Sequence, residues 1–261
     1  MYIDLHVHTN RYSSCAAMSP QEMAAEALAV GLDAVVITEH NTIWSEDELA
    51  DLQSEFPSLL ILRGFEVSAA GRHDILVYGV SDTTGFTRGM PPEEAVALAH
   101  ERDGIAILAH PFRYQEELAA EVLAAPFDLC ETRSVNIDPY HHELGSTLAR
   151  HYGVPEVYNS DGHHPVSLGS YYNKLHKSVS NMDELMDVLR RAAFTPMEQP
   201  ERVRPALEDR VERIKIGIRR SIRMGITEPE AVWRRVGNAR QRIYEMLPQV
   251  LAELEQAQAG G

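Results

Sequence analysis

Short apolar runs alternate with stretches of helical periodicity along most of the chain. The apolar runs are IDLHVH (3–8), AVVITEH (34–40), LLILRGFE (59–66), DILVYGV (74–80), IAILAH (105–110), DLCET (128–132) and EVYNSDGH (156–163). The helical stretches cover 19–31, 91–104, 114–125, 141–153 and 181–194. The first of them has Ser19 and Pro20 as start signals and Gly31 as a stop signal. Strand–helix alternation of this length predicts parallel strands covered by helices, as a doubly wound sheet or a (β/α) barrel.

A different pattern begins at the proline-rich stretch FTPMEQPERVRP (194–205), which indicates a boundary. We therefore predict a barrel over residues 1–196 and a helical extension over residues 197–261. An apolar stripe in the extension consists of Val211, Ile214, Ile218 and Ile222. Thr227 and Glu230 have the spacing of a capping box for a second helix. One side of that helix is expected to carry Trp233, Val236, Ile243, Leu247, Val250 and Leu254.

Charge is distributed unevenly between these two parts. The formal net charge is −15, yet half of all Lys and Arg residues lie within 197–261, so the predicted barrel is strongly acidic. An acidic surface disfavours binding of long nucleic acid. We expect the amphipathic helices of the extension to pack on the barrel or on a second subunit, which would give a homo-oligomer. Binding of nucleic acid by their basic faces is the alternative.

Composition limits the cellular compartments in which we expect the protein. No stretch approaches the length of a membrane span, and no charged-then-apolar leader precedes the first run. Cys15 and Cys130 are the two cysteines in 261 residues, which argues against a disulfide framework. We therefore expect a cytoplasmic protein without a membrane segment.

Polar residues gather where the apolar runs end. In a strand, His6 and His8 share one face with Asp4, whereas Ile3, Leu5 and Val7 occupy the other. Other runs end in His40, Glu66, His110 and the pair Asp161 and His163, and His73 opens the fourth run. The carboxyl ends of the strands form the edge where barrels and open α/β sheets build active sites. Mixed imidazole and carboxylate ligands suit Zn, Mn or Fe, and their number implies two or three divalent metals.

These motifs resemble those of the PHP (polymerase and histidinol phosphatase) domain family over roughly residues 1–195. The shared signatures are HxH, T-[DE]-H, G-x-E, a His before a short strand, A-H-P and a late S-D-x-H. The resemblance implies a distorted (β/α)7 TIM-like barrel with a metal cluster. It further implies a first metal on His6, His8, Glu66 and Asp161, a second on Glu66, His73 and His110, and a third on His40 and His163.

The third site departs from the family pattern. The stretch TNRYSSCA follows HxH, where the family often has an Asp or His. The third metal is therefore expected to be weak, absent, or bound through Cys15 or water. Glu39 replaces the commoner Asp of the T-D-H motif and is expected to orient a metal ligand.

The resemblance suggests a metal-dependent phosphoesterase that acts on a small phosphomonoester, such as a nucleotide or a sugar or amino-alcohol phosphate. Adjacent metals would lower the pKa of a bridging water to give the attacking hydroxide. We expect Asp161, His40 and His163 to be catalytic, with either histidine protonating the leaving group. Arg113 and Arg133 are the candidate phosphate-binding residues. The alternatives are an exonuclease-like phosphodiesterase on nucleic-acid ends and an inactive PHP-like binding module.

Overall fold

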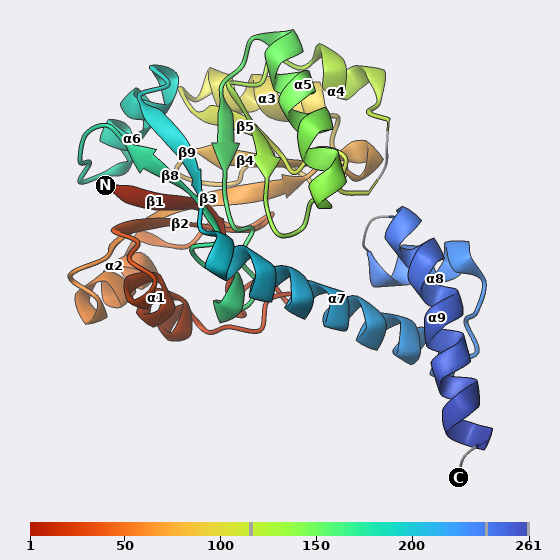
Figure 1. Cartoon of the computed structure of the whole chain (residues 1–261). Coiled ribbons are helices and arrows are strands. Elements are labelled where there is room, and N and C mark those ends of the chain that lie inside the picture. The colour runs from red at the N-terminus through yellow and green to blue at the C-terminus, as the bar shows by residue number, and fades with distance from the viewer. Residues whose placement is uncertain (115–116, 238–239, 260–261) are drawn as a thin grey trace.

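In the computed structural model, which describes residues 1–114, 117–237 and 240–259, nine strands form one curled sheet in the order β7-β6-β5-β4-β3-β2-β1-β8-β9 (Figure 1). The strands are β1 (Tyr2–Val7), β2 (Ala34–His40), β3 (Leu60–Ser68), β4 (Asp74–Tyr78), β5 (Ile105–Ala109), β6 (Leu129–Arg133), β7 (Glu156–Tyr158), β8 (Tyr171–Leu175) and β9 (Phe194–Glu198). All seven predicted strands form, and the sheet is a nearly closed, distorted α/β barrel.

The Asn173 side chain bridges β7 and β8 where the barrel closes, and the segment after β7 also pairs with β1, because the N–H of His8 donates to the carbonyl of Gly162 (2.9 Å). The Asn173 amide donates a hydrogen bond to the carbonyl of Tyr158 (2.7 Å) and accepts one from the Tyr158 N–H (3.2 Å). It also donates to the side-chain oxygen of Asn159 (3.0 Å). A buried amide therefore bridges the two strands at the seam.

The expectation of parallel strands throughout is wrong for part of the sheet. β4 lies antiparallel to both β3 and β5, and β8 lies antiparallel to β1 and β9. Residues 69–73 join β3 to β4, and they include the short 3-10 helix Ala70–Arg72. That connection is too short for a crossover helix, so the chain turns back as a hairpin. Gly71 permits the turn because its φ is +71°.

Six helices surround the sheet within the described barrel residues, namely α1 (Pro20–Ala29), α2 (Glu46–Glu55), α3 (Pro92–Glu101), α4 (Ala120–Ala124), α5 (His142–Tyr152) and α6 (Met182–Arg190). Capping boxes formed by Ser19 with Glu22 and by Ser45 with Glu48 begin α1 and α2. α4 is shorter than the helix predicted over 114–125, of which residues 115 and 116 lie outside the described residues.

The core of the barrel explains which end of it is open. Leu185, Val188 and Leu189 of α6 pack in one cluster with Ile3 and Leu5 at the start of β1. α6 therefore fills the end of the barrel where β1 begins, and the carboxyl ends of the parallel strands remain available for a site.

β1 does not alternate regularly as predicted. Ile3 and Leu5 belong to the interior cluster, whereas Val7 packs with α1 and α2 residues outside the sheet. The pairing register with β2 shifts between Asp4 and Val7. This irregularity lets an apolar strand begin in the core and end with inward-facing histidines.

The extension consists of α7 (Pro200–Arg223), α8 (Pro229–Val236) and α9 (Arg240–Ala259). The long helix α7 leads away from the barrel, so α8 and α9 lie to one side of it (Figure 1). The predicted stripes exist, but they pack mainly on each other. Their buried residues are Ile214, Ile218, Val232, Ile243, Met246, Leu247 and Val250. The start of α7 packs on the barrel, where Ala206 contacts the cluster of Val135 and Tyr171.

Two details of the extension differ from the prediction. The expected second helix is split into α8 and α9 by Gly237, whose φ is +66°. The N-cap of α8 is Glu228 without a side-chain hydrogen bond, so the predicted Thr227 capping box does not form. Pro229 at the first helical position moved the start of the helix one residue along. β9 continues the sheet to Glu198, and α7 begins at Pro200.

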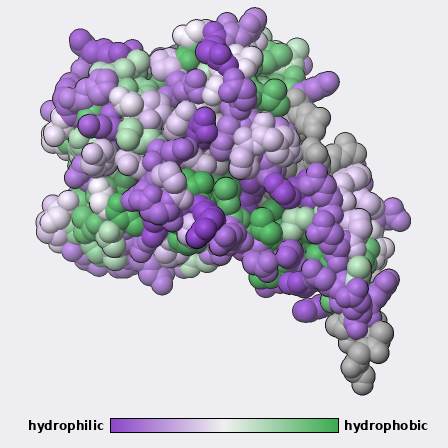
Figure 2. All heavy atoms as spheres, in the orientation of Figure 1, coloured by the Kyte–Doolittle hydropathy of each residue, from purple (hydrophilic) through white to green (hydrophobic). Residues whose placement is uncertain are grey.

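The described helices include none that is both long and apolar enough to span a bilayer. Figure 2 shows a visible surface dominated by hydrophilic residues, with small hydrophobic areas between them.

Candidate metal centre

Polar side chains from five parts of the sequence meet at one end of the barrel. His6 and His8 come from the end of β1, His40 ends β2, and Glu66 lies near the end of β3. Nε2 of His6 lies 2.9 Å from Nε2 of His8, and the latter nitrogen lies 3.2 Å from Oε2 of Glu66. All of these side chains are buried except His40, which is 29% exposed. The fold of the barrel thus brings potential metal-ligand atoms together in a buried environment.

The loops after β5 and β7 complete this group with His110, Asp161 and His163. Nε2 of His110 lies 3.0 Å from Oε1 of Glu66, and Oδ1 of Asp161 lies 3.4 Å from Nε2 of His6. The backbone at His110 and Asp161 has positive φ angles of 28° and 49°. Such strained conformations persist where surrounding contacts fix a functional side chain.

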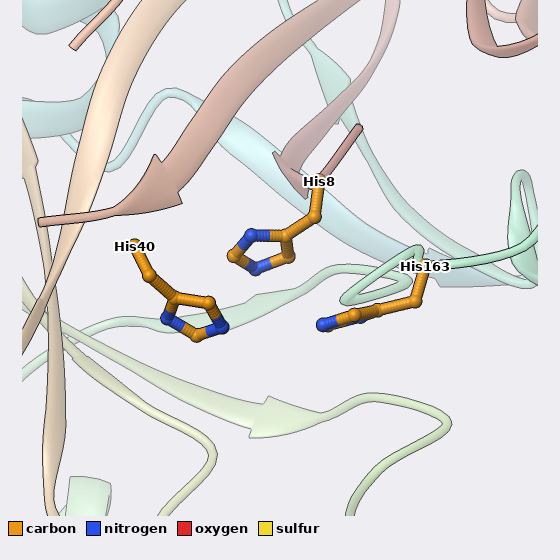
Figure 3. A group of neighbouring side chains, drawn as sticks. All are labelled: His8, His40 and His163. Atoms are coloured by element: carbon orange, nitrogen blue, oxygen red, sulfur yellow. The ribbon is translucent and has the colours of Figure 1, made fainter. Parts of the chain in front are cut away.

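Among the described residues, these side chains form four overlapping groups whose ligand atoms lie within 4.8 Å of one another. The groups are His6–His8–Glu66, His6–His110–Asp161, Glu66–Asp74–His110 and His8–His40–His163. Figure 3 shows the three rings of the last group converging on one space. Shared members are what a centre with adjacent metals requires, because one ligand then contacts two ions.

Electrostatics favour cations at this place. Burial opposes ionisation of Glu66, but His40, His6 and a hydrogen bond from His110 outweigh it and hold its pKa well below the usual value. Burial likewise opposes ionisation of Asp161, and His6 and Arg113 hold its pKa well below the usual value. Two ionised carboxylates are therefore buried side by side. Oε2 of Glu66 lies 2.8 Å from Nδ1 of His40, and among the described residues Oδ1 of Asp161 has no hydrogen-bond partner.

A buried carboxylate that the sequence did not reveal positions two of the histidines. Oε1 of Glu131 lies 3.0 Å from Nδ1 of His6, and Oε2 accepts a hydrogen bond from the backbone N–H of His110 (2.9 Å). Asn159 donates to the same carboxylate at 2.8 Å. A carboxylate behind a ligating imidazole fixes its tautomer and ring orientation. The available signal was a carboxylate at the end of the sixth apolar run.

Glu39 orients His8 through Ser13, in agreement with the expected role of the TEH motif. The Ser13 hydroxyl donates to Glu39 and lies 3.3 Å from Nδ1 of His8. Thr9 donates to the same carboxylate at 2.5 Å, and the Trp44 indole donates at 3.2 Å. With these donors, Glu39 is a fixed buried acceptor behind the histidine.

Asp74, the neighbour of the ligand His73 that the resemblance implied, forms a ligand group with Glu66 and His110. Along β4, Leu76 and Tyr78 face the barrel interior, and Asp74 shares their face because side chains alternate. Oδ2 of Asp74 lies 4.0 Å from Nε2 of His110. Among the described residues, His73 belongs to none of the four groups, although it is buried.

The two candidate arginines lie in different surroundings. Nη1 of Arg113 lies 3.2 Å from Oδ2 of Asp161 and 3.3 Å from Nε2 of His110, so it borders the cluster. Arg133 instead points toward Glu198, 3.8 Å away, and its guanidinium lies over the ring of Tyr158.

Comparison with known proteins places this fold and cluster in a family. The sequence model of the PHP domain matches residues 4–192. The chain belongs to the PHP domain family. An uncharacterized protein, MJ1587 of Methanocaldococcus jannaschii, is 28% identical over 122 residues, which are 43% of this chain and 68% of the relative. The PHP match covers every member of the four groups.

Two solved structures show the same fold as this PHP protein at low identity. One is a two-domain protein from Bacteroides vulgatus that contains a predicted PHP-like metal-dependent phosphoesterase; its TM-score is 0.59 at 16% identity, over 80% of this chain and 69% of that one. The other is a lesion-specific endonuclease from Pyrococcus furiosus, with a TM-score of 0.55 at 19% identity, over 75% of this chain and 57% of that one.

Proposed function

We propose that this PHP protein is a metal-dependent phosphoesterase that hydrolyses a small phosphomonoester. The observation that carries the proposal is the buried, overlapping set of imidazoles and carboxylates at the open end of the barrel. Glu66 and Asp161 are buried there among imidazoles that lose their protons when they bind a metal, so divalent cations would take over the charge compensation that His6 and His40 now provide.

The donor set fits divalent metals that accept both nitrogen and oxygen. Mn, Zn and Fe take mixed imidazole and carboxylate ligands, whereas Mg and Ca prefer oxygen alone. The residues that would hold these metals are His6, His8, His40, Glu66, Asp74, His110, Asp161 and His163. When bound, such cations activate water and offset negative charge on a phosphoryl group.

The residues of the chain supply the remaining chemistry. Arg113 lies beside Asp161 and His110, where its planar guanidinium can bind two phosphoryl oxygens. His40 is partly exposed and lines the cavity outside the cluster, and when no metal occupies the group His8–His40–His163 its protonated ring can serve a leaving alkoxide as general acid. Glu131 and Glu39 keep His6 and His8 in fixed orientations behind the reacting group.

A small substrate fits the space beside the centre better than a nucleic acid does. The cavity next to His40 and His163 has a volume of about 310 Å³, which is the size of a small-ligand pocket. Its far wall belongs to the extension. The fold likeness to an endonuclease keeps phosphodiester cleavage as the second candidate.

The test is phosphate release by the full chain in the presence of Mn²⁺. The panel contains an aryl phosphate, small metabolite phosphomonoesters and a bis-aryl phosphodiester. We expect the monoesters to turn over, His8→Ala to lower the rate by several orders of magnitude, and exposed His176→Ala to leave it unchanged. Cleavage of the diester alone would favour the second candidate. Turnover that survives in His8→Ala would contradict the assigned centre.

A further inference from the structure

The cavity beside the metal centre has two walls of different origin. The barrel contributes Cys15, His40, Arg113, Tyr114, Asn136 and His163. The opposite wall comes from the extension, as Arg210, Arg213, Ile214, Val236 and Gly237. The PHP match ends at residue 192, so the second wall is specific to the chain beyond the family domain. A substrate in this cavity therefore contacts residues that the PHP domain does not supply.

Buried polar contacts hold the extension against the barrel. Oδ1 of Asp138, in the loop after β6, lies 3.3 Å from Nη1 of Arg210 on α7 and 2.7 Å from Nη2 of Arg242 on α9. Asp138 and Arg210 are both buried. The Arg72 guanidinium lies 4.2 Å from the ring centre of Trp233 on α8. These contacts fix the second wall, so its side chains are positioned for a ligand before one arrives.

Three arginines line the cavity although the protein is acidic, and each of them contacts a carboxylate, as Arg113 does Asp161, Arg210 does Asp138 and Arg213 does Asp209. Arg113, Arg210 and Arg213 line one space of about 310 Å³. Burial lowers the pKa of Arg210 to about 10; Asp138 opposes this effect, and the neighbouring charges of Arg113, Arg242 and Arg213 add to it. Such crowding of like charges is relieved when an anion enters.

Arg213 is the residue of the wall best placed to meet a ligand. Arg210 is buried against Asp138, whereas Arg213 is partly exposed and its Nε contacts Asp209, one turn earlier on the same helix. Among the residues that the structure describes, the Arg213 guanidinium bonds to Asp209 through Nε, so its terminal nitrogens can donate to an anion in the cavity that Arg213 lines.

We propose that Arg213 forms an anion subsite on the extension that binds a second anionic group of the substrate, remote from the scissile phosphate. The inference rests on the proposed function and narrows its substrate class to small phosphomonoesters that carry a second phosphate or a carboxylate. Arg113 faces the metal centre and contacts the reacting phosphate, while Arg213 on the opposite wall sets specificity.

Binding of compounds that cannot be hydrolysed tests the subsite. The probes are propylphosphonate and the propane bisphosphonate that has a second phosphonate at the far carbon, titrated by calorimetry into the full chain with Mn²⁺. We expect wild-type protein to bind the bisphosphonate about tenfold more tightly, as a charge-assisted contact provides. Arg213→Gln should lose this preference and keep its affinity for propylphosphonate. Arg220→Gln is the matched control, because Arg220 is exposed on the same helix.

The outcomes separate the subsite from the reaction. Equal affinity of wild-type protein for the two probes, or a preference that persists in Arg213→Gln, overturns the subsite. Loss of affinity for both probes in Arg213→Gln also overturns it, because the residue would then act on the whole site. A preference that depends on Arg213 in a protein that hydrolyses no phosphate ester supports the subsite and refutes the phosphoesterase.

Discussion

Replacing Asp74 by Asn should weaken one metal strongly, whereas replacing its neighbour His73 by Ala should not. Asp74 forms one group with Glu66 and His110 and shares the inward face of β4, and His73 lies in none of the groups among the described residues. Structural zinc sites bind with roughly 10–16 kcal/mol over four ligands, or about 3 kcal/mol per ligand. Losing one ligand should therefore lower the affinity for that metal by about a hundredfold.

A second measurement distinguishes a ligand from a residue with a purely structural role. Burial and the nearby Glu66 carboxylate raise the pKa of Asp74, so its charge is unfavourable in the metal-free protein. Asp74→Asn removes this repulsion and should preserve or raise the thermal stability of protein treated with a chelator. If Asp74 merely supported the fold, the Asp74→Asn variant would be less stable than the wild-type protein both with and without metal.

The assay is elemental analysis after dialysis against a series of buffered Mn²⁺ concentrations, followed by scanning calorimetry of the chelated proteins. We expect Asp74→Asn to need about a hundredfold more Mn²⁺ for the affected site. His73→Ala should follow the wild-type curve. If instead His73→Ala lowered the Mn²⁺ affinity and Asp74→Asn did not, β4 would present its other face to the centre. That result would refute the reasoning from strand alternation.

Three further predictions concern the surroundings of the centre. Glu131→Gln should lower metal affinity by roughly 10–100-fold with little loss of secondary structure, as measured by metal titration and circular dichroism, because it only orients His6. The group His8–His40–His163 should bind its metal most weakly, so two metals should survive dialysis. If three metals survive, loss of the third in the Cys15→Ser variant would identify the Cys15 thiol, which lines the cavity, as its ligand. Burial and the charge of Arg133 lower the pKa of His142 to about 4, so the unfolded chain binds more protons below pH 6.5 and stability should fall as the pH drops toward 4. Urea unfolding at pH 7 and pH 4.5 measures the stability lost between the two pH values, and this loss should be about 2 kcal/mol smaller in His142→Asn than in the wild-type protein. An equal loss in both proteins would contradict the lowered pKa of His142.

Apolar periodicity and the polar ends of the runs predicted a sheet covered by helices with ligand residues at one edge, and the resemblance to the PHP family then favoured the barrel. Strands must bury their apolar residues, and their carboxyl ends then meet at one edge, so His6, His40, Glu66 and Asp161 came together without further information. His73 stays a predicted ligand, but among the described residues it is Asp74 that joins a ligand group, and this has a local cause. The turn at Gly71 sets the phase of β4, and a shift of one residue exchanges the inward and outward faces.

Contacts between segments that are distant in the sequence could not be predicted from the sequence alone. Glu131 lies in an apolar run, and only the approach of His6 from β1 gives it a role. The stripes of the extension predicted amphipathic helices but not their partners, because an apolar stripe packs equally well on any apolar surface. Placement of Arg213 in the cavity depends on the Asp138 contacts that fix α7 and α9.

The seam of the barrel links closure of the fold to occupancy of the metal centre. Asn173 holds β7 to β8, its partner Asn159 donates to Glu131, and Glu131 holds His6. Opening the seam would release Glu131 and disturb a metal ligand, so closed and open states differ in their affinity for metal. By linkage, a metal at a hundred times its dissociation constant would then stabilise the closed seam by up to about 2.7 kcal/mol. Bound cations would thus also suppress local unfolding at the seam between β7 and β8, and amide exchange along these two strands would slow as the centre fills.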